Sequence, residues 1–364
     1  MNANYGDDSP VAAFATIPGK SALTLIRCSG AGAIEITASV FSAPEKLKQA
    51  LGNTVVHGWI LAANTKIDEV LVSVFRAPKS YTGEDSLEIS CHGGPAAGRA
   101  VLGALISAGF RDALPGEFTF RSFFNGKLDL TRCESVMEIV SAKTETGRRH
   151  AVMRLSGVLE KEINEIKKLL VEVLSETEIF LDYSEDEIGT GTDETEGRLP
   201  GQDIVPVALG RLKKLGSSWE HERIYQEGIP VVIAGRPNAG KSSLFNLLLK
   251  EERSIVTEIP GTTRDWIEAW VSIEGIPIRL FDTAGLCQSA DPVEKAGVER
   301  SRKLLEEAEL VLYLIDGAQG VTGEDRELLA EFGKPILLLW NKADIAPMPQ
   351  LPFAANITIS VSAK

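Results

Sequence analysis

The chain has 364 residues, which exceeds one ordinary domain and indicates two or three folded units. Its formal charge of -13 at pH 7 argues against a general nucleic-acid-binding protein, because phosphate contacts need clustered Lys and Arg. No early segment has the pattern of a secretion signal, and no run of about 18 apolar residues predicts a membrane span, so we expect a cytoplasmic protein without membrane contact. The scattered cysteines disfavour a disulfide framework or a zinc site: Cys28, Cys91, Cys133 and Cys287.

Residues 1–125 alternate strand-like and helix-like runs, which predicts an α+β domain. The strand-like runs are residues 22–27, 55–61, 69–75 and 86–90, and the helix-like runs are residues 31–41 and 95–110.

The apolar period becomes helical between Leu128 and Phe180. Leu, Ile and Val recur every three or four residues from Leu155 to Leu174, with Glu and Lys between them, which predicts one long amphipathic helix. The next segment, from Asp182 to Glu196, carries seven carboxylates and no Lys or Arg, so we expect a solvated loop. With a further helix at residues 203–225, we assign residues 126–226 to a central helical domain.

From residue 227 onward, short buried strands alternate with helical segments, which predicts a doubly wound α/β domain over residues 227–364. The strand-like runs are residues 230–235, 310–316, 335–340 and 357–361. The last run has no helix after it to cover it, so we expect the sequence to be a fragment.

The segment GRPNAGKS, residues 235–242, fits the phosphate-binding pattern G-x-x-x-x-G-K-[ST] between a strand and a helix. Its backbone amides and the helix N-terminus favour phosphate, Lys241 can reach the β- and γ-oxygens, and the Ser242 hydroxyl can ligate magnesium. The other loop residues assigned to the nucleotide are Asn238, Ala239, Gly240 and Ser243.

Two further motifs follow apolar strands. DTAG begins with Asp282, which can hold the magnesium shell at a strand's carboxyl end, and Gly285 can face the γ-phosphate. NKAD runs from Asn341 to Asp344, whose carboxylate can accept both N–H donors of guanine, whereas adenine offers no matching donors. Each tetrapeptide alone is a weak signal, but the ordered set predicts a guanine-nucleotide switch domain.

Two short segments complete that set by their spacing. GTTRD, residues 261–265, supplies Thr263 for magnesium. SAK at the end of the chain completes the base pocket: Ser362, Ala363 and Lys364.

The residues that would promote hydrolysis stay open at this point. Leu286 follows DTAG, where many small GTPases carry a glutamine that orients water. Glu294 is a candidate for that role, although the residues alone favour an exposed carboxylate on the first turn of a helix. Arg264 fits an arginine finger in cis and a surface switch residue equally well.

These motifs, GRPNAGKSSL, IVTEIPGTTRD, DTAGL and NKAD, resemble the G domain of the MnmE (TrmE) tRNA-modification GTPases. The segments SYTGEDSLEISCHGGP and PGEFTFRSFFNGKLDLTRCES extend the resemblance to nearly the whole chain and separate this family from other GTPases. The resemblance implies a folate-binding N-terminal domain that also dimerises, a central helical domain, and a Ras-like P-loop G domain inserted into it.

The resemblance also gives Asn238 a role, because the family's loop asparagine helps to coordinate potassium. The potassium ligands it implies are Asn238, Thr257, Ile259 and Thr262. Such an ion would supply the positive charge of an arginine finger, so the resemblance makes Arg264 a less favoured candidate for that role. Glu294 matches the family's glutamate that orients water through a bridging water, which makes Glu294 and Lys241 the expected catalytic residues. The same segments imply further GTP contacts: Glu258, Pro260, Gly261, Thr283, Ala284 and Lys342.

In the N-terminal domain, Arg27, Glu88 and Lys127 match the family's contacts to 5-formyl-tetrahydrofolate, and methylene-tetrahydrofolate is the other expected form. Without the resemblance these three would be ordinary surface charges. The family's C-terminal Cys-x-Gly-Lys tail and the second half of its helical domain have no counterpart in this sequence.

The resemblance therefore implies a potassium-activated GTPase that forms a homodimer and, with an MnmG-like FAD protein, a heterotetramer. Together they would add an aminomethyl or carboxymethylaminomethyl group at C5 of the wobble uridine of certain tRNAs, with folate as one-carbon donor. Hydrolysis would drive dimerisation of the G domains. The alternatives are an Era- or Der-like switch in ribosome assembly, and an N-terminal domain that serves only for dimerisation.

Overall fold

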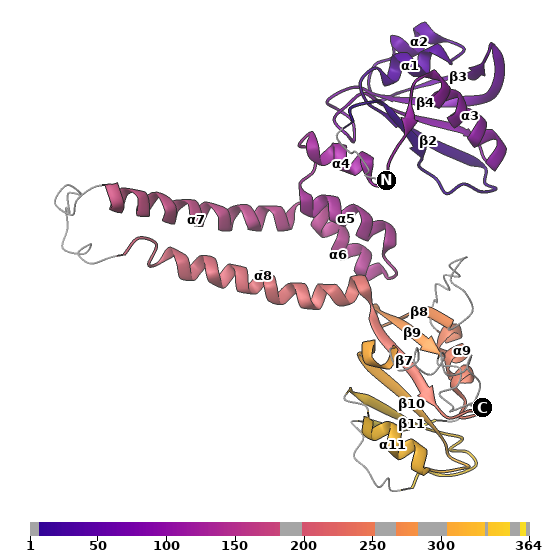
Figure 1. Ribbon diagram of the computed structural model, residues 1–364, viewed down its shortest axis with the longest axis vertical. Coiled ribbons are helices and arrows are strands. Elements are labelled where there is room, and N and C mark those ends of the chain that lie inside the picture. The colour runs from indigo at the N-terminus through magenta and orange to yellow at the C-terminus, as the bar shows by residue number, and fades with distance from the viewer. Residues whose placement is uncertain are drawn as a thin grey trace. The chain divides into compact units, whose positions relative to one another are not determined.

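The computed structural model describes residues 7–182, 199–251, 267–282, 304–331, 334–349 and 357–361. The chain divides into two compact units, Met1–Glu134 and Ser135–Lys364 (Figure 1). No helix in the described ranges is both long and apolar enough to cross a bilayer.

The first unit is built on a six-stranded sheet with the order β3-β4-β5-β2-β1-β6. Its strands are β1 (Val11–Phe14), β2 (Leu23–Ser29), β3 (Thr54–Ala62), β4 (Thr65–Phe75), β5 (Ser86–His92) and β6 (Arg111–Asp112). Neighbouring strands are antiparallel except β1 and β6, which are parallel. All four predicted strands are confirmed.

Three helices pack on one face of this sheet: α1 (Ala33–Ser39), α2 (Pro44–Lys48) and α3 (Pro95–Ala108). Helix α4 (Glu117–Phe124) brings Phe118 to the Arg27 side chain on the other face. Alternate side chains of the strands, such as Val72 and Ile89, are fully buried and pack in one cluster with Ile34 of α1 and Leu105 of α3. Because strand side chains alternate between faces, the residues between them, Glu88 among them, lie on the opposite face. The result is the α+β unit that the sequence predicts.

The helical segment differs from the single long helix predicted from Leu155 onward. It contains α5 (Leu130–Ser141), α6 (Glu145–Leu155), α7 (Val158–Asp182) and α8 (Ile204–Glu227). The helical conformation is interrupted between α6 and α7 at Gly157, whose φ of 86° cannot continue a helix. Thr144 starts α6 by accepting a hydrogen bond from the Gly147 amide at 3.1 Å. The helix expected at residues 203–225 is confirmed as α8, whereas most of the acidic loop lies outside the described residues.

The second sheet has the order β12-β11-β10-β7-β9-β8. Its strands are β7 (Ile229–Gly235), β8 (Ile267–Ile273), β9 (Ile276–Asp282), β10 (Leu310–Asp316), β11 (Ile336–Asn341) and β12 (Ile357–Ser360). All neighbours are parallel except β8 and β9, which form a hairpin. The doubly wound α/β prediction is confirmed for this sheet, and β8 is an edge strand that the sequence analysis missed.

Helices α9 (Lys241–Glu251) and α11 (Gly323–Glu331) flank this sheet. Phe245 of α9 packs in one apolar cluster with Leu314, and Tyr313 belongs to a second cluster on the other face. Since the central parallel strands are buried on both faces, their polar side chains gather where the strands end. The register places Asp282 beside Ile233 of β7 and Asn341 beside Asp316 of β10. Four strand ends therefore meet at one edge of the sheet.

The β8–β9 hairpin and the end of α8 pack on one another. A Cβ on Gly228, the residue after α8, would lie 2.5 Å from the ring of Trp270 on β8. The same ring has the Lys143 ammonium 5.8 Å and the Arg279 guanidinium 5.4 Å from its centroid. The hairpin that leads to Asp282 is therefore held by the helical segment that precedes β7.

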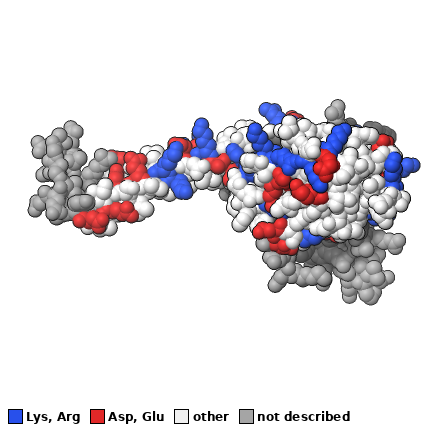
Figure 2. Space-filling model, turned by 90° about the horizontal axis from the view of Figure 1, so that it is seen from above, with Lys and Arg blue, Asp and Glu red and all other residues white. Residues whose placement is uncertain are grey.

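On the face of the molecule seen in Figure 2, Lys and Arg lie among Asp and Glu over the described surface instead of gathering in one basic patch. On this face, the distribution over the described residues agrees with the negative net charge.

Candidate nucleotide-binding site

The loop between β7 and α9 makes a tight turn. Asn238 has a φ of 63°, a left-handed conformation that Asn tolerates better than most residues. A Cβ on Gly240 would lie 2.2 Å from Asn341 Nδ2, so a larger residue there would displace Asn341. This geometry agrees with a loop whose backbone amides face a phosphate.

Lys241 holds the phosphate loop closed. Its side chain is buried, and its Nζ donates hydrogen bonds to the carbonyl oxygens of Gly235 at 2.8 Å and Arg236 at 2.9 Å. Since Lys241 is also the first residue of α9, its ammonium lies across the loop at a helix N-terminus. Positive charge at a helix N-terminus favours an anion at this place.

Ser242 and Asp282 form a pair of oxygen ligands beside the loop. The Ser242 hydroxyl donates to Asp282 Oδ2 at 3.2 Å, and Asp282 is buried at the end of β9. Its other oxygen, Oδ1, is buried and has no hydrogen-bond partner among the described residues. A hydroxyl and an unpaired carboxylate oxygen are ligands that Mg²⁺ accepts together with phosphate oxygens and waters, so these residues fit magnesium.

Asn341 joins the end of β11 to the phosphate loop. Its Nδ2 donates to the Ala239 carbonyl at 2.8 Å, while its Oδ1 accepts from the Lys342 amide at 2.8 Å. Lys342 Nζ donates to Asp316 Oδ2 at 2.6 Å. Burial raises the pKa of Asp316, but the hydrogen bonds from Lys342 and from the Ala318 amide outweigh it and leave the pKa below its ordinary value. The ion pair therefore persists at neutral pH and fixes the chain just before Asp344.

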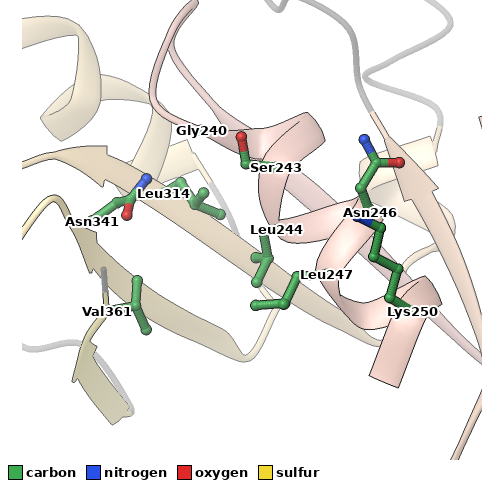
Figure 3. Close-up of a pocket in the computed structure, with 9 residues that line it drawn as sticks. All are labelled: Gly240, Ser243, Leu244, Asn246, Leu247, Lys250, Leu314, Asn341 and Val361. Atoms are coloured by element: carbon green, nitrogen blue, oxygen red, sulfur yellow. The ribbon is translucent and has the colours of Figure 1, made fainter. Parts of the chain in front are cut away.

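A cavity of about 480 Å³ opens beside Asn341 (Figure 3). Its lining residues are Gly240, Ser243, Leu244, Asn246, Leu247, Lys250, Leu314, Asn341 and Val361. Ser243, Asn246, Lys250 and Asn341 bring polar side chains to this cavity, and the leucines with Val361 make an apolar wall. Asp344, the residue predicted to recognise guanine, is not among the described residues that line this cavity.

In the first unit, Arg27 and Glu88 face each other across β2 and β5. Arg27 donates to Glu88 Oε1 from Nε at 3.0 Å and from Nη2 at 2.7 Å, and its guanidinium lies 5.3 Å from the ring centroid of Tyr81. Lys127 donates from Nζ to the Pro78 carbonyl at 2.9 Å. Both Arg27 and Glu88 keep part of their side chains exposed, so the pair remains accessible to a ligand.

Comparison with known proteins shows which family this chain belongs to. Residues 10–127 match the model described as GTP-binding protein TrmE N-terminus, and residues 230–342 match the model described as 50S ribosome-binding GTPase. The tRNA modification GTPase MnmE of Treponema denticola is 45% identical over 348 residues, which are 94% of this chain and 72% of that protein. The protein of the same name from Carboxydothermus hydrogenoformans is 43% identical over 343 residues, 93% of this chain and 73% of that protein. This chain belongs to the MnmE family.

The comparisons favour the MnmE family over the Era- or Der-like alternative, because the MnmE relatives match nearly the whole chain and not the G domain alone. In this chain the structure gathers the predicted residues Asn238, Lys241, Ser242, Asp282 and Asn341 at one sheet edge. Their assignment to GTP stays a prediction.

Many of the residues predicted for the MnmE-like site lie outside the described residues. They are Thr257, Glu258, Ile259, Pro260, Gly261, Thr262, Thr263, Arg264, Thr283, Ala284, Gly285, Leu286, Glu294, Ser362, Ala363 and Lys364.

The sequence analysis missed three groups beside the candidate nucleotide site: Asp316, which pairs with Lys342, and the pair Arg236 and Asp325, whose Nε and Oδ1 are 3.3 Å apart. Asp316 ends a buried strand just as Asp282 does, so strand-end position was a usable signal. Thr322 and Asp325 have the T-x-x-D spacing of a capping box, which marks a helix start, but this spacing gives no sign of the contact with Arg236, 89 residues away in sequence.

Proposed function

We propose that this chain is a GTP hydrolase that acts in tRNA modification with an MnmG-like flavoprotein. The pair would add an aminomethyl or carboxymethylaminomethyl group at C5 of the wobble uridine of certain tRNAs. The observation that carries the proposal is the convergence of Lys241, Asp282 and Asn341 at one sheet edge, in a chain whose residues 10–127 match the TrmE N-terminus.

The roles of the chain's own residues follow from their positions. Lys241 binds the β- and γ-phosphate oxygens from across the loop, and Asp344 recognises guanine on the turn after β11. Ser242 and Asp282 hold magnesium, directly or through its water shell, and Asn341 keeps the base pocket in register with the loop. Thr263, which lies outside the described residues, is assigned to the same ion by its sequence motif alone. Magnesium, when bound, neutralises charge that develops on the phosphate oxygens.

For hydrolysis we assign Glu294 to orienting the attacking water and Asn238 to holding potassium together with Thr257, Ile259 and Thr262. The Asn238 amide oxygen can ligate a cation without adding charge, and its left-handed backbone lets the loop turn at this residue. Potassium, when bound, supplies positive charge where an arginine finger would lie.

GTP hydrolysis should be faster in potassium than in sodium by about tenfold or more, because carbonyl and amide ligands spaced for the larger ion hold sodium poorly, and the bound ion supplies the charge of an arginine finger. Asn238→Ala should remove most of this difference while GTP binding survives. Asn238→Gly is the matched control for backbone strain, since Gly adopts the same φ without a side chain. Initial rates in the two salts measure the effect. Equal hydrolysis rates in the two salts for the unaltered protein would contradict the assignment. So would loss of the potassium preference in Asn238→Ala but not in Asn238→Gly.

The folate proposal places tetrahydrofolate in the N-terminal unit at Arg27, Glu88 and Lys127. Its support is the partly exposed Arg27–Glu88 pair beside Tyr81 and Phe118, whose ring centroid lies 5.8 Å from the Arg27 guanidinium. A carboxylate can accept the N–H donors of a pterin, and aromatic rings can pack on its faces. Lys127 joins this region through Pro78, in the same loop as Tyr81.

Glu88→Gln should weaken binding of 5-formyl-tetrahydrofolate by about 10- to 100-fold, because a hydrogen bond to a charged group contributes roughly 1.5–3 kcal/mol. Titration calorimetry measures the affinity. Glu69→Gln is the matched control, since Glu69 is also a surface carboxylate of this sheet but pairs with His57 at 2.9 Å. Equal affinity in the unaltered protein and the Glu88 variant would remove Glu88 from the site.

We further propose the three-domain division into residues 1–125, 126–226 and 227–364, a homodimer formed through the first domain, and tRNA as the modified partner. The direct test of the function is nucleoside analysis of tRNA from cells that lack this protein. We expect unmodified wobble uridine in place of the modified base, restored by the intact gene. An unchanged nucleoside profile would overturn the proposal.

A further inference from the structure

A fully buried carboxylate, Asp325, lies behind the phosphate loop. It is the third residue of α11, and its Oδ2 accepts hydrogen bonds from the amide and the hydroxyl of Thr322, both at 2.8 Å. This is the pattern of a helix capping box, in which the residue before the helix and the third residue satisfy each other. Capping accounts for one of the two carboxylate oxygens.

The second oxygen of Asp325 faces the phosphate loop. Oδ1 accepts the Tyr313 hydroxyl at 2.9 Å and lies 3.3 Å from Nε of Arg236, the second residue of the loop. Arg236 also donates from Nη2 to the Gly320 carbonyl at 3.2 Å. Burial, and then the charge of Asp325, raises the pKa of Tyr313 far above its ordinary value, so the phenol remains a donor. Arg236 is therefore held from behind the loop by groups that a helix cap alone does not need.

Arg236 connects this buried group to the phosphate-binding lysine. Its carbonyl oxygen accepts the hydrogen bond from Lys241 Nζ at 2.9 Å, so the position of the ammonium depends on where residue 236 is held. We propose that the Arg236–Asp325 ion pair is a positioning device that fixes Lys241 for the γ-phosphate. The inference deepens the proposed function and rests on it for the identity of the nucleotide.

Arg236→Met keeps most of the length of the side chain but removes its charge. GTP affinity should fall by about tenfold and GDP affinity by less, because Lys241 reaches both the β- and the γ-oxygens while GDP lacks the latter. Asp325→Asn should have a similar effect, and the double variant should be no worse than either single one, since residues that act as a pair are not additive. Arg236→Lys should restore most of the preference for GTP.

The controls separate positioning from stability. Tyr313→Phe removes a hydrogen bond from the same oxygen of Asp325 and leaves Arg236 in place, so it should lower the unfolding temperature without changing the ratio of GTP to GDP affinity. Affinities come from titration with fluorescent GTP and GDP analogues, and thermal unfolding is recorded on each variant.

Equal losses for GTP and GDP in Arg236→Met, in step with the loss in unfolding temperature, would overturn the inference and leave Asp325 as a helix cap. So would a change of the ratio in Tyr313→Phe as large as that in Arg236→Met. If the unaltered protein binds neither nucleotide, the proposed function fails, and that result is distinct because it precedes any comparison of variants.

Discussion

Replacing Asp344 with asparagine should make the base pocket accept xanthine in place of guanine. The carboxylate can accept both N–H donors of guanine, whereas the asparagine amide can donate to the additional carbonyl of xanthine. Sites that pair a polar edge discriminate against a mismatched analogue by roughly four to five orders of magnitude. We therefore expect the ratio of GTP to XTP affinity to change by about four orders of magnitude in Asp344→Asn, measured by competition against a fluorescent nucleotide.

ATP serves as the control in this experiment, because neither side chain matches the edge of adenine and its binding should stay poor in both proteins. The ion pair of Lys342 and Asp316 holds the neighbouring chain and is unchanged by the substitution. An unaltered preference for GTP in Asp344→Asn would show that another residue recognises the base.

Glu117→Ala should destabilise the N-terminal unit by about 3–5 kcal/mol, the range for breaking a buried ion pair. Glu117 is fully buried at the start of α4, and its carboxylate accepts hydrogen bonds from Arg111 Nη2 at 2.6 Å and Arg121 Nη2 at 2.9 Å. The substitution leaves both guanidinium groups without that carboxylate. Glu45→Ala is the matched control, since Glu45 is exposed and pairs only with the neighbouring Lys48 on the same helix, at 3.1 Å, among the described residues.

Denaturant unfolding of the full chain measures both variants, and the Glu45 control should lie within about 0.5 kcal/mol of the unaltered protein. A loss of that small size in Glu117→Ala would show that the buried network contributes no more than a surface pair.

The same carboxylate predicts acid sensitivity. Burial raises the pKa of Glu117, but the hydrogen bonds from Arg111, Leu114 and Arg121 outweigh it and hold the pKa below its ordinary value. Its stabilising contribution is therefore full above the unfolded pKa of about 4.3 and is lost as the pH falls through the lower folded pKa. Glu117→Gln should lessen this part of the fall in stability at low pH.

Strands and loops that are determined by one local sequence pattern could be predicted from the sequence. Runs such as residues 310–315 are almost continuously apolar because a parallel strand is buried on both faces, and they were recovered as strands. The phosphate loop was found because its glycines and Lys241 are required at fixed spacing. The break at Gly157 was missed because the apolar period continues across it, and only the backbone φ shows the interruption.

The contacts that hold the sites together were not predictable in the same way. Glu117 with Arg121 lies on one helix and looks like a surface pair, yet Arg111 and the fold bury it. Asp325 meets Arg236 only because β7 and β10 are neighbours in the sheet. Such pairs depend on the tertiary arrangement, and an isolated sequence carries no period or spacing for them.

The junction at Gly228 has a mechanical consequence. Helix α8 has 24 residues and is about 36 Å long, and it continues through Gly228 into β7, whose 7 residues span about 23 Å and end in the phosphate loop. Helix α8 and strand β7 thus extend to different lengths on the two sides of Gly228, and the Trp270 ring packs against this glycine. A rotation of about 10° there would move the far end of α8 by about 6 Å, a displacement larger than the rise of one helical turn. A pair of spectroscopic labels, one near the start of α8 and one on α11, would therefore measure a rotation at Gly228 as a change in the distance between the labels.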